Sequence, residues 1–102
     1  IDLRSAPGRA FQTAEAVVVD DIRESDEFKP SRTLLEHGIV SLVNVPVLID
    51  QASWGVLEVD HVEQRDFRED TVDFLLAVSR LIASVIQRHQ AEAAHRQALA
   101  AA

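Results

Sequence analysis

The four histidines are the side chains best suited to chemistry, because imidazole serves both as a metal ligand and as a general acid or base. His37 and His61 could share a metal ion only if the fold brought them together, and neither belongs to an i, i+4 pair. We therefore predict a capping or surface role for both. His89 and His95 are six residues apart, about 240° around a helix, so they cannot bind one ion from the same face. The residues around them lack the pattern of a kinase phosphorylation box, and we do not expect either to accept a phosphoryl group.

Two carboxylates, Glu58 and Asp60, alternate on one face of an expected strand and could form a catalytic acid and base pair. No nucleophile, base or phosphate-binding loop stands near them in the sequence. We interpret them as polar residues that point away from the core. The sequence therefore assigns no catalytic residue, no metal ligand and no cofactor, and an enzyme is the least favoured class.

Ser41 and Asn44 are polar residues within the apolar segment 39–49. Burial of a hydroxyl or amide without a partner costs about 1–3 kcal/mol, so each should find a hydrogen bond. One of them could point into a ligand pocket, but we favour bonds to the backbone at a bulge beside Pro46, which cannot donate to a strand ladder. Trp54 is expected to pack in the core or against the hairpin.

Six elements must position these side chains. Ser5 suits a helix N-cap and Pro7 the first turn, while Gly38 suits the residue after a helix. Residues 22–30 form a charged, solvated loop without EF-hand spacing, which Phe28 should anchor to the core. The expected elements are a helix over 6–13, a strand over 16–20, a short helix over 31–38, strands over 39–49 and 54–62 joined by a four-residue loop over 50–53, and a long helix over 69–102.

The last third of the chain contains no Gly or Pro and is predicted to be one continuous helix. Its polar residues Asp73, Arg80, Ser84 and Gln87 fall on one narrow stripe between 72 and 86, so the apolar surface is wide enough for two partners. Beyond Ile86 the sequence is rich in Ala, Gln and Arg. We expect the first half to dock and dimerise and the second half to act as a connecting rod, with these candidates for the homodimer contact: Leu75, Val78, Leu81, Ile82 and Val85.

Composition limits the class of protein. The 102 residues suffice for one small domain, and 47% hydrophobic with 26% charged residues is an ordinary globular composition. The formal charge of −7 disfavours nucleic acid and anionic membrane partners. The absence of cysteine excludes disulfides, thiolate metal sites and cysteine nucleophiles.

Seven short motifs follow one another along residues 5–75: SAPGRAFQT (5–13), VVVDDI (17–22), HGIVS (37–41), NVPV (44–47), WGVLEV (54–59), DF (66–67) and DTVDFL (70–75). Their order resembles the later two thirds of a GAF domain, of the kind found in bacterial sensor histidine kinases of the HWE type or related types. The resemblance implies a six-stranded antiparallel sheet with a small-molecule pocket on one face and helices on the other that often make a dimer.

These observations together predict an α+β fold, an antiparallel β-sheet flanked by helices, that is incomplete at its N-terminus and ends in a long helix. Residues 1–86 would form the sensor domain and residues 87–102 the signalling helix. Strands upstream of Ile1 are suspected, and a second copy is expected to cover any bare strand edge. We expect a cytoplasmic regulatory module that relays a signal through its dimerising helix. The alternative is a small-molecule-binding domain of a transcription regulator or metabolic enzyme, and the ligand is unidentified in both cases.

Overall fold

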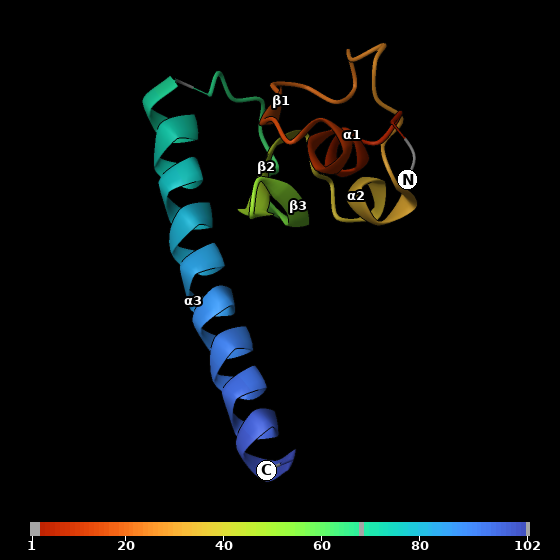
Figure 1. Cartoon of the computed structure of the whole chain (residues 1–102). Helices are drawn as coiled ribbons and strands as arrows, with labels where there is room; N and C mark the ends of the chain where they lie inside the picture. Colours follow the sequence, from red (N-terminus) through yellow and green to blue (C-terminus); the bar gives the residue numbers. More distant parts are fainter. Residues whose placement is uncertain (1–2, 68, 102) are drawn as a thin grey trace.

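The computed structural model describes residues 3–67 and 69–101, which form three layers (Figure 1). A sheet lies between two short helices and one long helix. The elements in chain order are α1 (Ala6–Thr13), β1 (Val17–Val19), α2 (Arg32–Glu36), β2 (Ser41–Ile49), β3 (Ala52–His61) and α3 (Glu69–Ala101). All six predicted elements are present, which confirms the α+β arrangement with a long C-terminal helix.

Local capping explains where the short helices begin and end. The Ser5 hydroxyl accepts a hydrogen bond of 3.0 Å from the Gly8 amide at the start of α1, and Ser31 accepts one of 3.2 Å from Leu34 at the start of α2. Ala14 adopts a left-handed φ of 57° after α1, and Gly38 one of 68° after α2. The predicted caps at Ser5 and Gly38 are therefore confirmed.

Both neighbours of β2 within the described residues are antiparallel to it, in the order β1, β2, β3. Successive side chains of β2 alternate between two covered faces, so its residues 41–47 are all buried. Leu42 faces α1 and α2 together with Val17 and Val19 of β1, whereas Val43, Val45 and Val47 lie on the face that α3 covers. A strand that is covered on both faces needs apolar residues on both, which explains why β2 shows no alternation of apolar and polar residues.

The β2–β3 hairpin differs from the prediction at its turn. The strands leave a loop of only two residues, Asp50 and Gln51, whose φ angles of 53° and 67° are both positive, as a type I′ turn requires. The prediction of a four-residue loop over 50–53 is wrong, because β3 already begins at Ala52. An irregularity lies between Val47 and Leu48, one residue after Pro46, close to the predicted bulge.

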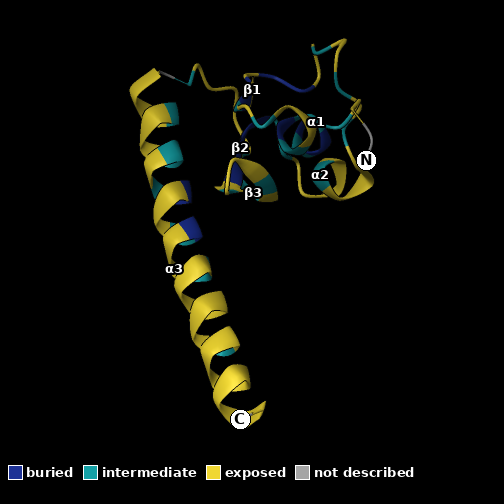
Figure 2. Ribbon diagram, viewed as in Figure 1, coloured by how far each residue is buried: buried dark blue, intermediate teal, exposed yellow. Residues whose placement is uncertain are grey.

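The long helix α3 extends well beyond the sheet that it covers (Figure 1). Its 33 residues span about 50 Å, and the molecule has principal extents of 58 × 28 × 23 Å. Ser79 and Ala83 are its buried residues, and Figure 2 shows the C-terminal half almost wholly exposed. Ser79 was missing from the predicted polar stripe: it faces the sheet, and its hydroxyl donates to the Leu76 carbonyl at 2.7 Å.

Candidate functional site

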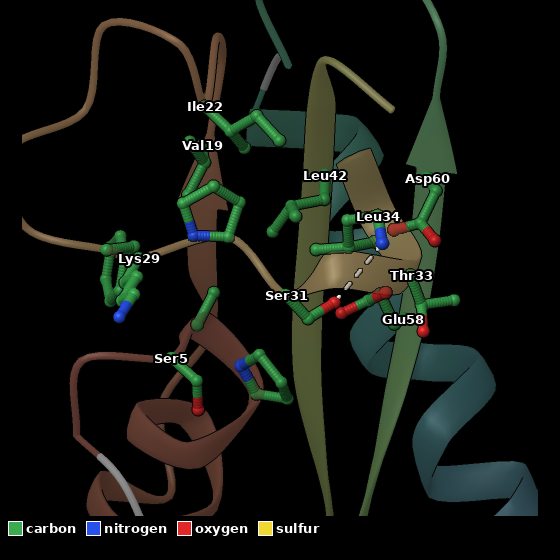
Figure 3. Close-up of a pocket in the computed structure, with 14 residues that line it drawn as sticks. Ser5, Val19, Ile22, Lys29, Ser31, Thr33, Leu34, Leu42, Glu58 and Asp60 are labelled. Atoms are coloured by element: carbon green, nitrogen blue, oxygen red, sulfur yellow. Dashed lines mark hydrogen bonds between the residues drawn. The ribbon is translucent and has the colours of Figure 1, made fainter. Parts of the chain in front are cut away.

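A cavity of about 260 Å³ lies between the sheet, α1, α2 and the loop over residues 22–30. Figure 3 shows its lining side chains converging from all four segments. Most of the lining is apolar, with hydroxyl groups and three charged side chains added. The residues are Ser5, Ala6, Pro7, Val19, Ile22, Phe28, Lys29, Pro30, Ser31, Thr33, Leu34, Leu42, Glu58 and Asp60.

The floor of the cavity is the hydrophobic core of this face. Small residues allow α1 to approach the sheet closely, because Ala6 and Ala10 are buried on the same side of the helix. Val19 and Leu42 are direct partners in the β1–β2 ladder and form the base. Phe28 and Leu34 pack against this core from the loop and from α2, which confirms Phe28 as the predicted anchor of the loop.

The loop over residues 22–30 is tied down at both ends. The Ile22 amide donates to the Val40 carbonyl at 2.7 Å, and the Lys29 amide donates to the Arg4 carbonyl at 2.8 Å. Arg9 of α1 lies 4.6 Å from the Phe28 ring centroid and forms an ion pair of 2.8 Å with Glu27. These contacts hold the loop over the cavity.

Asp21 organises the beginning of this loop. Its carboxylate accepts hydrogen bonds from the Arg23 guanidinium at 2.8 and 2.9 Å and from the Arg23 amide at 2.9 Å. The side-chain hydrogen bonds from Arg23 are the main reason that the pKa of Asp21 lies below its usual value. The acidic loop is therefore locally ordered by one arginine.

One wall of the cavity carries a pair of carboxyl groups, Glu58 and Asp60, on the same face of β3. Burial is the largest cause that raises the pKa of Glu58 to about 7, followed by the hydrogen bond and the charge of the neighbouring Asp60. The sequence interpretation that both residues point away from the core is wrong for Glu58, which is half-buried, whereas Asp60 is exposed as expected although it too lines the cavity. The register reveals the reason, because Asp60 pairs with the inward-facing Leu42 and Glu58 pairs with Asn44.

Asn44 lies behind this wall and is completely buried. Its amide favours the ionised form of Glu58 and so acts against the other causes of that pKa shift. Neither the oxygen nor the nitrogen of its side chain reaches hydrogen-bonding geometry with any described residue. The expectation that Asn44 bonds the backbone is therefore wrong, whereas the Ser41 hydroxyl does so, donating to the Glu63 carbonyl at 2.7 Å.

The remaining residues singled out in the sequence lie outside the cavity. His37 is the C-cap of α2, with Nδ1 2.9 Å from the Thr33 carbonyl, which confirms its capping role. The nitrogen Nδ1 of His61 accepts from the Glu63 amide at 3.0 Å. His89 and His95 are exposed on α3. Trp54 is 54% exposed, so the first of its two predicted roles, packing in the core, is wrong, and packing against the hairpin stays a prediction.

Two further hollows border the sheet. One of about 270 Å³ lies where Pro46 and Leu48 meet α3, and one of about 530 Å³ runs along the acidic loop from Asp20 to Glu27. Among residues 3–67 and 69–101, no three His, Cys, Asp or Glu side chains are grouped so that they could hold a metal ion. None of the helices in the described part is long and apolar enough to cross a membrane.

Comparison with solved structures identifies the fold. A domain of a protein assigned as a two-component sensor histidine kinase from Sinorhizobium meliloti 1021 matches with a TM-score of 0.74 and 23% identity, over 82% of this chain and 59% of that one. The GAF domain of a phosphoenolpyruvate-protein phosphotransferase from Coxiella burnetii matches with a TM-score of 0.76 and 18% identity, over 92% of this chain and 56% of that one. The type II free methionine-R-sulfoxide reductase from Thermoplasma acidophilum matches with a TM-score of 0.69 and 17% identity, over 86% of this chain and 60% of that one.

The chain thus spans somewhat more than half the length of each of these structures. No curated protein matches its sequence. The sequence does match the model of the GAF domain over residues 1–86, which include the cavity, the sheet and the docked part of α3. The chain therefore belongs to the GAF domain family of regulatory sensor modules that bind small molecules.

Proposed function

We propose that this chain is the sensor part of a cytoplasmic sensor histidine kinase, in which a small molecule in the cavity changes the packing of the sheet and α3 carries that change to an output domain. One observation carries the proposal: β2 borders the cavity on one face and α3 on the other. Leu42 lines the cavity, and the next residue, Val43, is buried on the face that α3 covers.

The central strand is a direct mechanical link between ligand and helix. Residues of β2 are packed on both faces without exposed positions from Ser41 to Val47. A packed interface switches between discrete arrangements instead of deforming continuously. A ligand that moves Leu42 would therefore shift the neighbouring residues against Ser79 and Ala83 of α3, and a change in helix rotation or register would follow.

The exposed face of α3 supports the proposed homodimer. Phe74, Leu81 and Val85 are 58%, 68% and 68% exposed. Together with the half-buried Val78 they follow the alternating spacing of four and three residues that coiled coils use. Of the candidates drawn from the sequence, Leu75 and Ile82 are half-buried and lie four and three residues from the buried Ser79, which places them beside the face that packs on the sheet. We assign the dimer contact to the face that contains Leu81 and Val85.

A screen by thermal shift tests whether the cavity binds a small molecule. A ligand at a hundred times its dissociation constant should add about 2.7 kcal/mol to the free energy of unfolding. Leu34→Trp, which fills the cavity, should abolish the shift. Leu35→Trp is the matched control, because Leu35 belongs to the same helix but is 59% exposed and does not line the cavity.

The relay itself is tested with a single cysteine introduced as Leu99→Cys, since the chain has no other cysteine. A ligand found in the screen should change the rate at which two copies form a disulfide between these residues. It should also change autophosphorylation of the full-length protein. If saturating ligand leaves the rate of disulfide formation unchanged, α3 does not relay the signal. The chain would then be only a ligand-binding domain.

The second candidate is a small-molecule-binding domain of a metabolic enzyme or transcription regulator. The similarity to the GAF domain of a phosphoenolpyruvate-protein phosphotransferase supports it. Ligand-dependent stabilisation without self-association through α3 would favour this candidate over the kinase sensor. Sedimentation of the full-length protein with and without ligand distinguishes them.

A further inference from the structure

We infer that the cavity selects a small organic cation, an ammonium group on an apolar body, with Glu58 and Asp60 as the partners of the charge. This inference rests on the proposed function, because it assigns a ligand class to the same cavity. Three observations carry it: the position of the carboxyl pair, the lack of an ion pair between it and a cation of the described residues, and the apolar surface that faces it.

The first observation is that both carboxyl groups line one wall. They lie two residues apart on β3, so their side chains emerge on the same face of the sheet (Figure 3). Burial and the neighbouring Asp60 both disfavour the ionised form of Glu58. A cation placed between the two side chains would favour the ionised form of Glu58.

The second observation is that, within residues 3–67 and 69–101, no ion pair of Glu58 or Asp60 is found. The ion pairs of Arg9 with Glu27, Arg23 with Asp21 and Arg32 with Glu36 all use other carboxylates. Lys29 is the basic residue of the cavity lining, and it is exposed at the opposite side of the cavity from the carboxyl groups in Figure 3. The charged groups that face Glu58 inside the cavity are thus Asp60 nearby and Lys29 across it.

The third observation concerns the rest of the surface. Val19, Ile22 and Leu42 form an apolar floor, and Phe28 and Leu34 form apolar sides. Such a lining favours a ligand with an alkyl or aromatic body and only a few polar groups. An apolar body attached to an ammonium group matches both parts of the cavity.

Asn44 adds a polar group without a partner behind the same wall. It is fully buried, it is the direct ladder partner of Glu58, and both polar atoms of its side chain lack a hydrogen bond among the described residues. A cation drawn to Glu58 would fix that carboxylate next to the amide. The Asn44 nitrogen could then donate to the ionised carboxylate, which removes an unmet hydrogen bond.

A divalent metal fits this site less well than an organic cation. Two carboxyl groups provide few oxygens for an ion that takes six or more ligands, and no larger metal-binding group is found in the described part of the chain. The hydroxyl groups of Ser31 and Thr33 line the cavity from α2, and Ser31 already accepts a hydrogen bond from Leu34.

Three probes with one ring and different head groups test the inference on the full chain: benzylamine, benzyl alcohol and benzoate. Calorimetric titration at about pH 8 should show that benzylamine binds about tenfold or more tightly than the other two. The preference should shrink at about pH 6, where Glu58 holds its proton, and binding should release a proton near neutral pH.

Charge removal provides the second arm of the test. Glu58→Gln and Asp60→Asn should each abolish most of the preference for benzylamine. The matched controls are Glu92→Gln and Asp73→Asn, which remove the same charges from exposed positions on α3 and should leave the preference intact. Circular dichroism checks the fold of each variant. If a variant does not fold, the probe series and its pH dependence still test the inference, because both use the unmodified chain.

The outcomes separate this inference from the proposed function. Three results would overturn the preference for an organic cation but leave a ligand-binding cavity. They are equal binding of all three probes, tightest binding of benzoate, and binding of Mg²⁺ alone at this wall. A preference that persists when both carboxylates are removed would also overturn it. Failure of every probe to bind, with no hit in the thermal-shift screen, would overturn the inference and the small-molecule sensor together.

Discussion

Asn44 of β2 and Glu58 of β3 are direct partners in the antiparallel ladder, and this pairing places a buried amide behind an ionisable carboxyl group of the cavity wall. Burial and Asp60 together keep the pKa of Glu58 at about 7. The wall of the cavity and the residue behind it therefore hold polar groups that the described residues do not fully satisfy.

The raised pKa of Glu58 predicts how stability depends on pH. The folded chain holds a proton on Glu58 up to about pH 7, whereas the unfolded chain releases it near the ordinary value of 4.5. Between these values the folded state binds more protons, so the free energy of unfolding should fall as pH rises from 4.5 to about 7. Urea unfolding across this range should show less of this fall in Glu58→Gln.

The control for this experiment is Glu92→Gln, which should keep the pH dependence of the unmodified chain. Asp21 acts in a different window, because Arg23 lowers its pKa and its contribution is lost only in more acidic solution. Identical pH profiles for Glu58→Gln and the unmodified chain would contradict the assignment of the titration to Glu58.

Ser41 and Asn44 should respond to substitution in opposite ways, although both are fully buried. Ser41→Ala removes the hydrogen bond to the Glu63 carbonyl and should lower the free energy of unfolding by about 1–3 kcal/mol. Asn44→Leu removes an amide without a partner and should be neutral within about 1 kcal/mol, or stabilising. Chemical denaturation measures both. A large loss for Asn44→Leu would mean that the amide has a partner in solution.

The parts of the fold that depend on local sequence could be predicted well. The caps at Ser5 and Gly38 are set by neighbouring residues alone, so the helices were placed correctly. The buried strand over residues 41–49 follows from its unbroken apolar run. The long helix follows from the absence of Gly and Pro after residue 68.

The candidate site could not be predicted in the same way because it depends on strand register. The sequence alone does not show which face of the sheet Glu58 and Asp60 occupy, because it does not reveal that Asp60 pairs with Leu42. A register shifted by one residue would turn both side chains to the other face. The turn was missed for a related reason: Asp50 and Gln51 both adopt positive φ without a glycine, so no strong turn signal marks them. Only the paired strands force that geometry.

The Asp50–Gln51 turn yields a prediction of its own. A non-glycine residue in the left-handed region is strained by about 1 kcal/mol or more, and Gln51 has a φ of 67°. Gln51→Gly should therefore raise the thermal midpoint and add up to about 1 kcal/mol to the free energy of unfolding. Gln64→Gly is the matched control at an exposed loop position outside the residues with positive φ, and it should bring no gain. Equal effects of the two substitutions would show that the turn is unstrained.

The two faces of α3 can be separated by the neighbours Leu81 and Ile82. Leu81 is 68% exposed, so Leu81→Glu should change the free energy of unfolding of the monomer by no more than about 0.5 kcal/mol while it weakens self-association. Ile82 is half-buried on the side of the sheet, so Ile82→Glu should destabilise the fold itself by about 2 kcal/mol or more. Gln97→Glu, at an exposed position beyond the docked part, should do little to either property.

Sedimentation velocity measures the association, and circular dichroism during urea unfolding measures the fold. If the exposed face is the dimer contact, Leu81→Glu gives a folded monomer at concentrations where the unmodified chain is dimeric, because a carboxylate at the centre of an apolar seam repels its copy and loses hydration. A dimer that tolerates Leu81→Glu would place the contact elsewhere. A parent protein that is a stable folded monomer would remove the dimer altogether, leaving α3 to transmit any change of the cavity within a single copy.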